Sequence, residues 1–206
     1  MKKLIYILSI LVALNLSSCI VVKHDEPDDD VAPLVKLSPK PEIPMSDLQV
    51  RSAKGDMIAF LPEGWFFVDT EEGTSADIFA VAVNPDYTLS AVFSVIRKTE
   101  TIDDVVSREG LLGLARTSLA RHEQKTAGGV KLAGKYAEVE MGPQKFCKFE
   151  FVSAKGGLRT RAVVFKSSFD RYYQFSLIPM NFSGKPHLQS TEIDKIFNSI
   201  LATIEY

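Results

Sequence analysis

Four runs of β-forming residues follow one another in the second half of the chain, with only short turns between them. They cover residues 132–141, 145–153, 158–167 and 172–178. The turns contain Gly142-Pro143, Gly156-Gly157 and Phe169-Asp170-Arg171. Strands joined by so few residues lie side by side and run antiparallel, because a parallel connection needs a crossover of a dozen residues or more. The spacing therefore predicts an antiparallel sheet at the centre of the fold.

The first half of the chain predicts two hairpins and one short extended run. Turn residues divide the hairpins, with Gly55 in the first and Pro85 in the second. The hairpin strands and the extended run cover residues 48–53, 57–61, 77–83, 88–97 and 65–68. Their enrichment in Val, Phe and Ile is typical of strands that are at least half buried.

Two amphipathic helices are predicted at residues 101–122 and 191–203. In each, a threonine precedes an aspartate by three residues, which is the spacing of an N-terminal capping box; the threonines are Thr101 and Thr191. Apolar residues recur along one face of each helix, so each needs a sheet face to cover it. Gly110 disrupts the first helix, as does Gly113, and we expect both to allow close packing on the sheet.

These elements predict a mixed α/β chain of the α+β type, with an antiparallel sheet sandwiched between helices. The chain has 206 residues, of which 46% are apolar, enough for one domain with a core of its own. We place this domain at residues 47–206.

Three segments carry a resemblance to a known fold family. They are Phe60-Leu61-Pro62-Glu63-Gly64-Trp65, Leu132-Ala133-Gly134 and Ile196-Phe197-Asn198-Ser199-Ile200. Together with the order of the elements, they make residues 47–206 resemble the Mog1/PsbP-like proteins and the small bacterial lipoproteins of the DcrB kind. The resemblance implies an antiparallel sheet between helices. It implies no single activity, because members of this fold serve different roles and share no catalytic residue.

A short positive segment and an apolar run open the chain. Lys2 and Lys3 precede apolar residues 4–14, a run that fits the core of a secretory signal peptide and is too short to cross a bilayer as a helix. The four residues that follow resemble the lipobox of bacterial lipoproteins, and they are Leu16-Ser17-Ser18-Cys19. The resemblance implies that residues 1–18 are a signal peptide, removed before Cys19. A plain secretory signal and an uncleaved anchor are the alternatives.

By the same resemblance, Cys19 is the lipidation site, and a diacylglyceryl group is attached to its thiol. The new amine then receives an acyl chain such as palmitate, and several chains together hold a protein stably on a membrane. Ile20 follows the cysteine, which favours the outer membrane facing the periplasm under the sorting rule of two-membrane bacteria. The acidic cluster further on, residues 25–30, resembles some surface-export signals, so surface exposure is a second possibility.

Residues 19–46 have the composition of a flexible stalk. Five of the ten prolines fall here, at Pro27, Pro33, Pro39, Pro41 and Pro44. Proline-rich polar sequence buries too little apolar area to offset the entropy of ordering it. We therefore expect an extended tether between Cys19 and the domain.

No catalytic, cofactor-binding or metal-binding residue is predicted. Cys147 alternates with Phe149 and Phe151 toward the core, where a thiol is inert. His122 near a helix end complements the helix dipole.

Three glutamates are interpreted as charge on a solvated edge or face of the sheet, and they are Glu138, Glu140 and Glu150. His24 falls in the stalk and His187 in a loop. The densest basic group could meet an anionic headgroup or polymer, and otherwise it pairs with the neighbouring glutamates; its members are Lys155, Arg159, Arg161, Lys166 and Arg171.

The sequence therefore predicts a cell-envelope lipoprotein that is not an enzyme. Its partners are the membrane, through Cys19, and an envelope protein, while a formal charge of −2 gives no sign of nucleic-acid binding. The leading hypothesis is a protein-binding or assembly-accessory domain. The first alternative is a small-molecule or lipid-binding module with a cleft between a helix and the sheet, and the second is a hydrolase with an unrecognised site.

Overall fold

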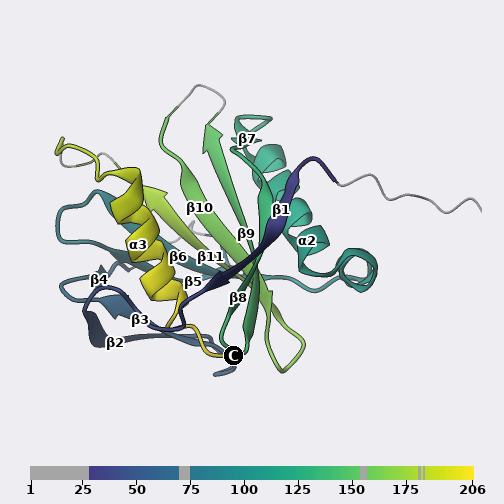
Figure 1. Ribbon diagram of the computed structural model, residues 1–206, viewed down its shortest axis with the longest axis horizontal. Coiled ribbons are helices and arrows are strands. Elements are labelled where there is room, and N and C mark those ends of the chain that lie inside the picture. The colour runs from purple at the N-terminus through teal and green to yellow at the C-terminus, as the bar shows by residue number, and fades with distance from the viewer. Residues whose placement is uncertain (1–27, 70–74, 154–156, 181, 183) are drawn as a thin grey trace, which may run out of the picture.

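The computed structural model describes residues 28–69, 75–153, 157–180, 182 and 184–206 (Figure 1). In chain order its elements are β1 (Val31–Leu37), β2 (Met45–Arg51), β3 (Ile58–Pro62), β4 (Phe66–Phe67), β5 (Ile78–Val83), β6 (Leu89–Ile96), α2 (Glu100–Lys125), β7 (Val130–Leu132), β8 (Tyr136–Met141), β9 (Gln144–Ser153), β10 (Thr160–Lys166), β11 (Tyr172–Pro179) and α3 (Ser190–Leu201).

A nine-stranded sheet forms the middle of the molecule, in the order β1-β8-β9-β10-β11-β6-β5-β4, with β7 also paired to β9. Every pair in it is antiparallel except β1 with β8. The four consecutive runs predicted from the sequence are confirmed as neighbours. The first run is divided into β7 and β8 at Gly134, whose φ of 102° is a conformation that L side chains rarely adopt.

The sheet is buried on both faces, and α2 and α3 lie on opposite sides of it (Figure 1). On β10, Val163 and Phe165 face a core that includes Phe197 of α3, whereas Ala162 and Val164 face the core under α2. A large apolar side chain contributes about 1.5–3 kcal/mol when it is buried completely. The predicted sandwich of an antiparallel sheet between helices is confirmed.

The hairpin β2–β3 forms a separate two-stranded sheet beside α3. Its residues Val50, Ala59 and Leu61 belong to the same core as Phe197. Thr203, just after α3, bonds the hairpin through its hydroxyl group, which accepts from the backbone N–H of Phe60 at 2.9 Å. The hairpin and α3 thus cover one face of the sheet together.

The predicted stalk is wrong for its C-terminal part, because β1 is a strand of the main sheet. Val31 pairs with Tyr136 and Leu37 with Met141, in parallel register along the free edge of β8. Pro33 falls where the register shifts, and proline is tolerated at an edge or a bulge because its missing N–H leaves no ladder bond unmade. Further on, the backbone N–H of Glu42 donates to Ser199 of α3 at 2.9 Å.

The proline-rich composition therefore misled the domain boundary at residue 47. The folded part of the chain begins before β1, and only residues 19–27 of the predicted stalk lie outside the described residues.

Both predicted N-caps are also wrong, and each helix begins one residue earlier than expected. Thr99 caps α2 and accepts from the backbone N–H of Ile102 at 3.3 Å. In α3, the Glu192 carboxylate accepts from the backbone N–H of Gln189, which is the cap. Each true cap has extended backbone angles while the predicted threonine already lies in the helix, a distinction that residue type alone does not make.

Helix α2 is kinked at Gly110, whose φ of 63° and ψ of −146° are not helical. A Cβ at Gly113 would lie 2.6 Å from Cγ1 of Val105 and 2.8 Å from Cβ of Glu109. The expected close packing on the sheet is therefore wrong for Gly113, because the neighbours that exclude a side chain belong to the first part of α2. Gly110 is required by its backbone angles and not by packing.

A buried carboxylate ties the β2–β3 hairpin to the β10–β11 turn. Asp56 accepts hydrogen bonds from the hydroxyl groups of Ser52 at 2.8 Å, Ser167 at 2.7 Å and Tyr173 at 2.6 Å, and Arg171 lies 3.2 Å away. Burial alone raises the pKa of Asp56, but the hydrogen bonds from Tyr173, Ser167 and Ser52 outweigh burial and lower it to about 2.

We predict that Asp56→Asn lowers the free energy of unfolding by about 1–3 kcal/mol, because an amide accepts fewer of these bonds. Since the folded pKa of Asp56 lies below the unfolded value of 3.8, the wild type keeps this stabilisation above about pH 4 and loses it as the pH falls toward 2. The variant lacks that part of the acid dependence. Urea unfolding across this pH range measures both effects.

Asp47→Asn is the matched control, because Asp47 is an exposed carboxylate on β2 that makes no ion pair within the described ranges. Equal stability of Asp56→Asn and the wild type at neutral pH would contradict the role assigned to Asp56.

Candidate functional site

A pocket forms where α2 stops covering the sheet. The helix packs on β7, β8, β9 and β10, and the same face of the sheet continues beyond it onto β11, β6 and β5. At this uncovered part, the C-terminal half of α2 and the sheet together enclose a pocket of about 230 Å³. Apolar side chains line much of it, among them Ile78, Val92, Phe151 and Ile178.

The floor of the pocket is a chain of buried polar side chains. Ser118 of α2 donates to the side-chain oxygen of Gln174 on β11, and the Gln174 amide nitrogen donates to Ser176 Oγ at 2.8 Å. The three side chains are between 4% and 6% exposed. Polar groups buried to this degree are costly unless their hydrogen bonds hold them in one arrangement, so this floor is rigid.

His122 stands in the wall, one helical turn after Ser118. Its ring stacks on Phe151 with centroids 5.0 Å apart, and its Nε2 lies 3.1 Å from the amide nitrogen of Gln174. An amide nitrogen only donates, so Nε2 accepts and the imidazole is neutral, with its proton on Nδ1. Burial lowers the pKa of His122, and the positive charge of Lys125 lowers it further. The expected position of His122 in the last turn of the helix is confirmed, and its ring also lines the pocket, which the sequence did not predict.

The mouth of the pocket carries positive charge. Arg121 and Lys125 of α2 line it, and neither has an ion-pair partner among the residues that the structure describes. Asp77 also lines the pocket, but its carboxylate accepts from Arg97 at 2.5 Å.

This arrangement is suited to binding a molecule. Ser118 lies one turn from His122, the spacing at which a histidine could activate a serine, but the Ser118 hydroxyl donates to Gln174 instead of to the imidazole. The hydroxyl is therefore not polarised as a nucleophile. The expectation that the protein is not an enzyme stays a prediction.

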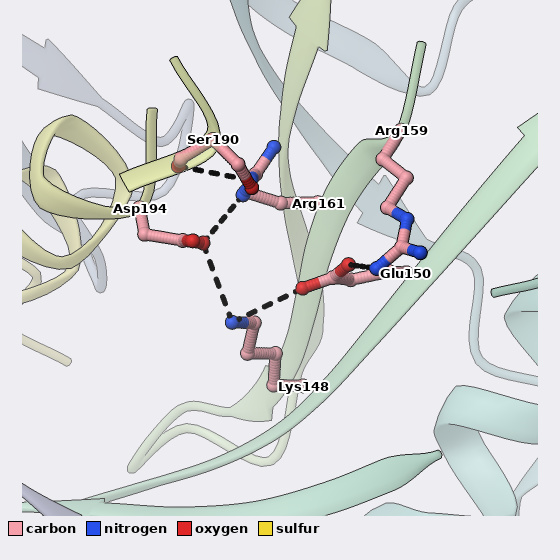
Figure 2. Close-up of polar contacts among 6 residues, drawn as sticks. All are labelled: Lys148, Glu150, Arg159, Arg161, Ser190 and Asp194. Carbon is pink, nitrogen blue, oxygen red and sulfur yellow. Dashed lines mark hydrogen bonds and ion pairs between the residues drawn. The ribbon is translucent and has the colours of Figure 1, made fainter. Parts of the chain in front are cut away.

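The predicted basic group includes a buried arginine that joins α3 to the sheet (Figure 2). Arg161 of β10 is 2% exposed, and it donates to Asp194 at 2.6 Å and to the hydroxyl of Ser190 at 2.8 Å. Lys148 of β9 lies 3.3 Å from Glu150 and 3.9 Å from Asp194. Asp194 of α3 is therefore paired with both β9 and β10.

The other described members of this basic group are also paired. Arg159 lies 3.4 Å from Glu150, Lys166 lies 2.5 Å from Asp170, and Arg171 contacts Asp56. Lys155 lies outside the described residues. The predicted pairing with a neighbouring glutamate is confirmed for Arg159, whereas Arg161, Lys166 and Arg171 pair with aspartates.

The remaining candidate residues do not gather at a site. Cys147 is completely buried, and burial raises the pKa of its thiol to about 12. Glu138 and His187 are exposed, and Glu140 lies 3.7 Å from Lys36 of β1. His24, Cys19 and the signal peptide lie outside the described residues.

Two features are absent from the described residues. These residues contain no helix that is long and apolar enough to cross a membrane. They also bring together no group of three or more His, Cys, Asp or Glu side chains that could hold a metal ion.

Sequence reasoning missed Gln174, Ser176 and Arg121. A signal for the first two is present in β11, where polar Gln174 and Ser176 alternate with apolar Tyr173, Phe175 and Leu177. In a strand that is buried on both faces, this alternation marks one face as polar. Nothing in the sequence placed that face beside the end of α2.

No family model matches the chain, and no curated protein matches it. Among solved structures, it resembles cyanobacterial PsbP (CyanoP) from Synechocystis sp. PCC 6803, with a TM-score of 0.53 and 16% identity over 77% of this chain and 92% of that one. The fold is therefore PsbP-like, as the sequence resemblance implied.

Two weaker likenesses are to a structure from Bacteroides thetaiotaomicron and to the immunity protein TplEi from Pseudomonas aeruginosa. Their TM-scores are 0.33 and 0.35, and their identities 13% and 11%. The matches cover 76% and 70% of this chain, and 47% and 55% of the other chains.

We predict that Cys147 is not alkylated by iodoacetamide while the protein is folded, because a buried thiol with a pKa of about 12 presents almost no thiolate. The same residue is alkylated once urea unfolds the chain. Peptide mass mapping after each treatment measures this. Labelling of the folded protein at the rate of a free cysteine would contradict the burial.

Proposed function

We propose that this protein is a lipid-anchored protein of the bacterial envelope whose folded domain is a binding module for a small molecule. The observation that carries the binding role is the pocket beside α2, with its hydrogen-bonded floor of Ser118, Gln174 and Ser176. Ligand sites are concave, mostly apolar and furnished with a few well-placed polar groups, and this pocket has those properties. The sequence ranked this function second, and the pocket is the reason to prefer it.

A protein-binding or assembly-accessory role is the second candidate, and surface residues favour it. Phe169, on the β10–β11 turn, is 70% exposed, and β1 leaves its outer edge unpaired within the described sheet. Exposed aromatic side chains and free strand edges are features that partner proteins bind.

The anchor is proposed from the lipobox at Leu16-Ser17-Ser18-Cys19. Asp28 and Asp30 both bond Arg116 of α2, at 2.5 Å and 2.7 Å, so the chain is attached to the domain by residue 28. The nine residues from Cys19 to Asp28 span at most about 30 Å when they are extended. A lipid on Cys19 therefore holds the domain close to the membrane surface, which is a shorter reach than a stalk of residues 19–46 would give.

We predict that the native protein begins at Cys19 and carries a diacylglyceryl group and an acyl chain, which intact-mass spectrometry measures. Cys19→Ala should abolish the lipid mass and release the protein from the membrane fraction, because two or more chains are needed for stable anchoring. Cys147→Ala is the matched control and should stay lipidated. An unmodified thiol at Cys19 in the native protein would contradict the anchor.

We predict that the full-length protein purified from its envelope retains a small molecule in native mass spectrometry. Ser94→Phe should abolish the adduct, because Ser94 lines the pocket and a phenyl ring there fills it. Gln49→Phe is the matched control, since Gln49 is exposed on β2 and away from the pocket.

The same measurement separates the two candidates. Absence of any small-molecule adduct from the wild type would contradict the ligand-binding role. An adduct with the mass of a second protein, retained in Ser94→Phe, would favour the protein-binding role instead.

A further inference from the structure

The charges around the pocket favour one class of ligand. Arg121 and Lys125 line it without an ion-pair partner in the described part of the chain, and Asp77, the one acidic side chain among the described lining residues, pairs with Arg97. The described lining therefore has net positive charge, which attracts an anion and disfavours a cation.

The hydrogen-bonding capacity that is left over is also of the donor type. Gln174 uses its side-chain oxygen to accept from Ser118, and its amide nitrogen donates to Ser176. Ser176 accepts that bond and donates none to the described residues, so its hydroxyl proton is available to a ligand. Arginine and lysine side chains add donors only. A ligand that accepts hydrogen bonds fits this site.

The size and walls of the pocket limit the rest of the ligand. A volume of 230 Å³ holds about eight waters at their ~30 Å³ share of liquid volume, and it is smaller than the ~300–1,000 Å³ of typical ligand sites. Ile78, Val92 and Phe151 give it apolar walls. The ligand is therefore small, and most of it is apolar.

We propose that the pocket binds a small organic carboxylate, with its carboxylate at Arg121 and Lys125 and its apolar body against Phe151 and Val92. This inference rests on the ligand-binding function proposed above and names its ligand class. A carboxylate has two oxygens, which the guanidinium fork of an arginine binds as a pair. A phosphate group carries a charge of about −1.5 to −2 at pH 7, which is more than the net +1 of Arg121, Lys125 and Asp77 balances.

The test uses octanoate and its neutral counterpart octanamide, titrated calorimetrically into the full-length protein in lipid nanodiscs, with empty nanodiscs as the blank. The two probes have the same size and shape, so their difference isolates the charge. Octanoate should bind about tenfold more tightly or better, since a hydrogen bond to a charged group contributes about 1.5–3 kcal/mol.

The double variant Arg121→Gln/Lys125→Gln should lose this preference and bind both probes with the affinity of octanamide. Arg108→Gln/Lys195→Gln is the matched control. It removes the same two charges from exposed helical positions that make no ion pair within the described residues and do not line the pocket, and it should bind like the wild type. Circular dichroism confirms that each variant is folded.

Four results would overturn the proposal. The first three are equal binding of octanoate and octanamide, full octanoate affinity in the Arg121→Gln/Lys125→Gln variant, and displacement of octanoate by equimolar inorganic phosphate. Equal binding of the two probes would leave the ligand-binding function standing, because the pocket would still be occupied. Binding of neither probe, with a small molecule retained in native mass spectrometry, would also overturn only the carboxylate assignment.

Discussion

Burial of the central strands on both faces is the constraint on which the rest of the structure depends. Strand β10 sends Val163 and Phe165 to the core under α3, and Ala162 and Val164 to the core under α2. Cys147 is free, so no disulfide supports the described fold and these two cores must stabilise it. The polar links to α3 and to the hairpin, through Arg161 and Asp56, then orient elements that the cores already hold.

The pocket forms because α2 covers only part of one face of the sheet. Helix α2 covers β7 to β10, and the cores there are apolar, but β11 and β6 continue past the helix. A bare apolar surface there would be exposed to water, and the sequence instead provides Ser94, Gln174 and Ser176 on that face. The result is a hollow with a polar floor, apolar walls and a positive mouth, which is the basis of the proposed ligand binding.

Local patterns predicted the elements well and their partners less well. The strand runs and hairpins were found because short turns force neighbouring strands together, and this depends on residues close in sequence. Strand β1 was missed because its pairing partner, β8, lies about a hundred residues away, and its prolines resemble those of a disordered linker. The cap of α2 was missed because Thr99 and Thr101 are equally good caps by residue type, and only the backbone angles distinguish them.

The sequence by itself determined the antiparallel sheet, the two amphipathic helices and the core position of Cys147, because each depends on spacing or alternation along the chain. It also carries the lipobox at Cys19, whose use is proposed. Only the tertiary structure decided that β1 belongs to the sheet and that His122 and Arg121 meet Gln174 around one pocket. Those contacts join residues some fifty or more positions apart, and their positions depend on where α2 crosses the sheet, which no local pattern encodes.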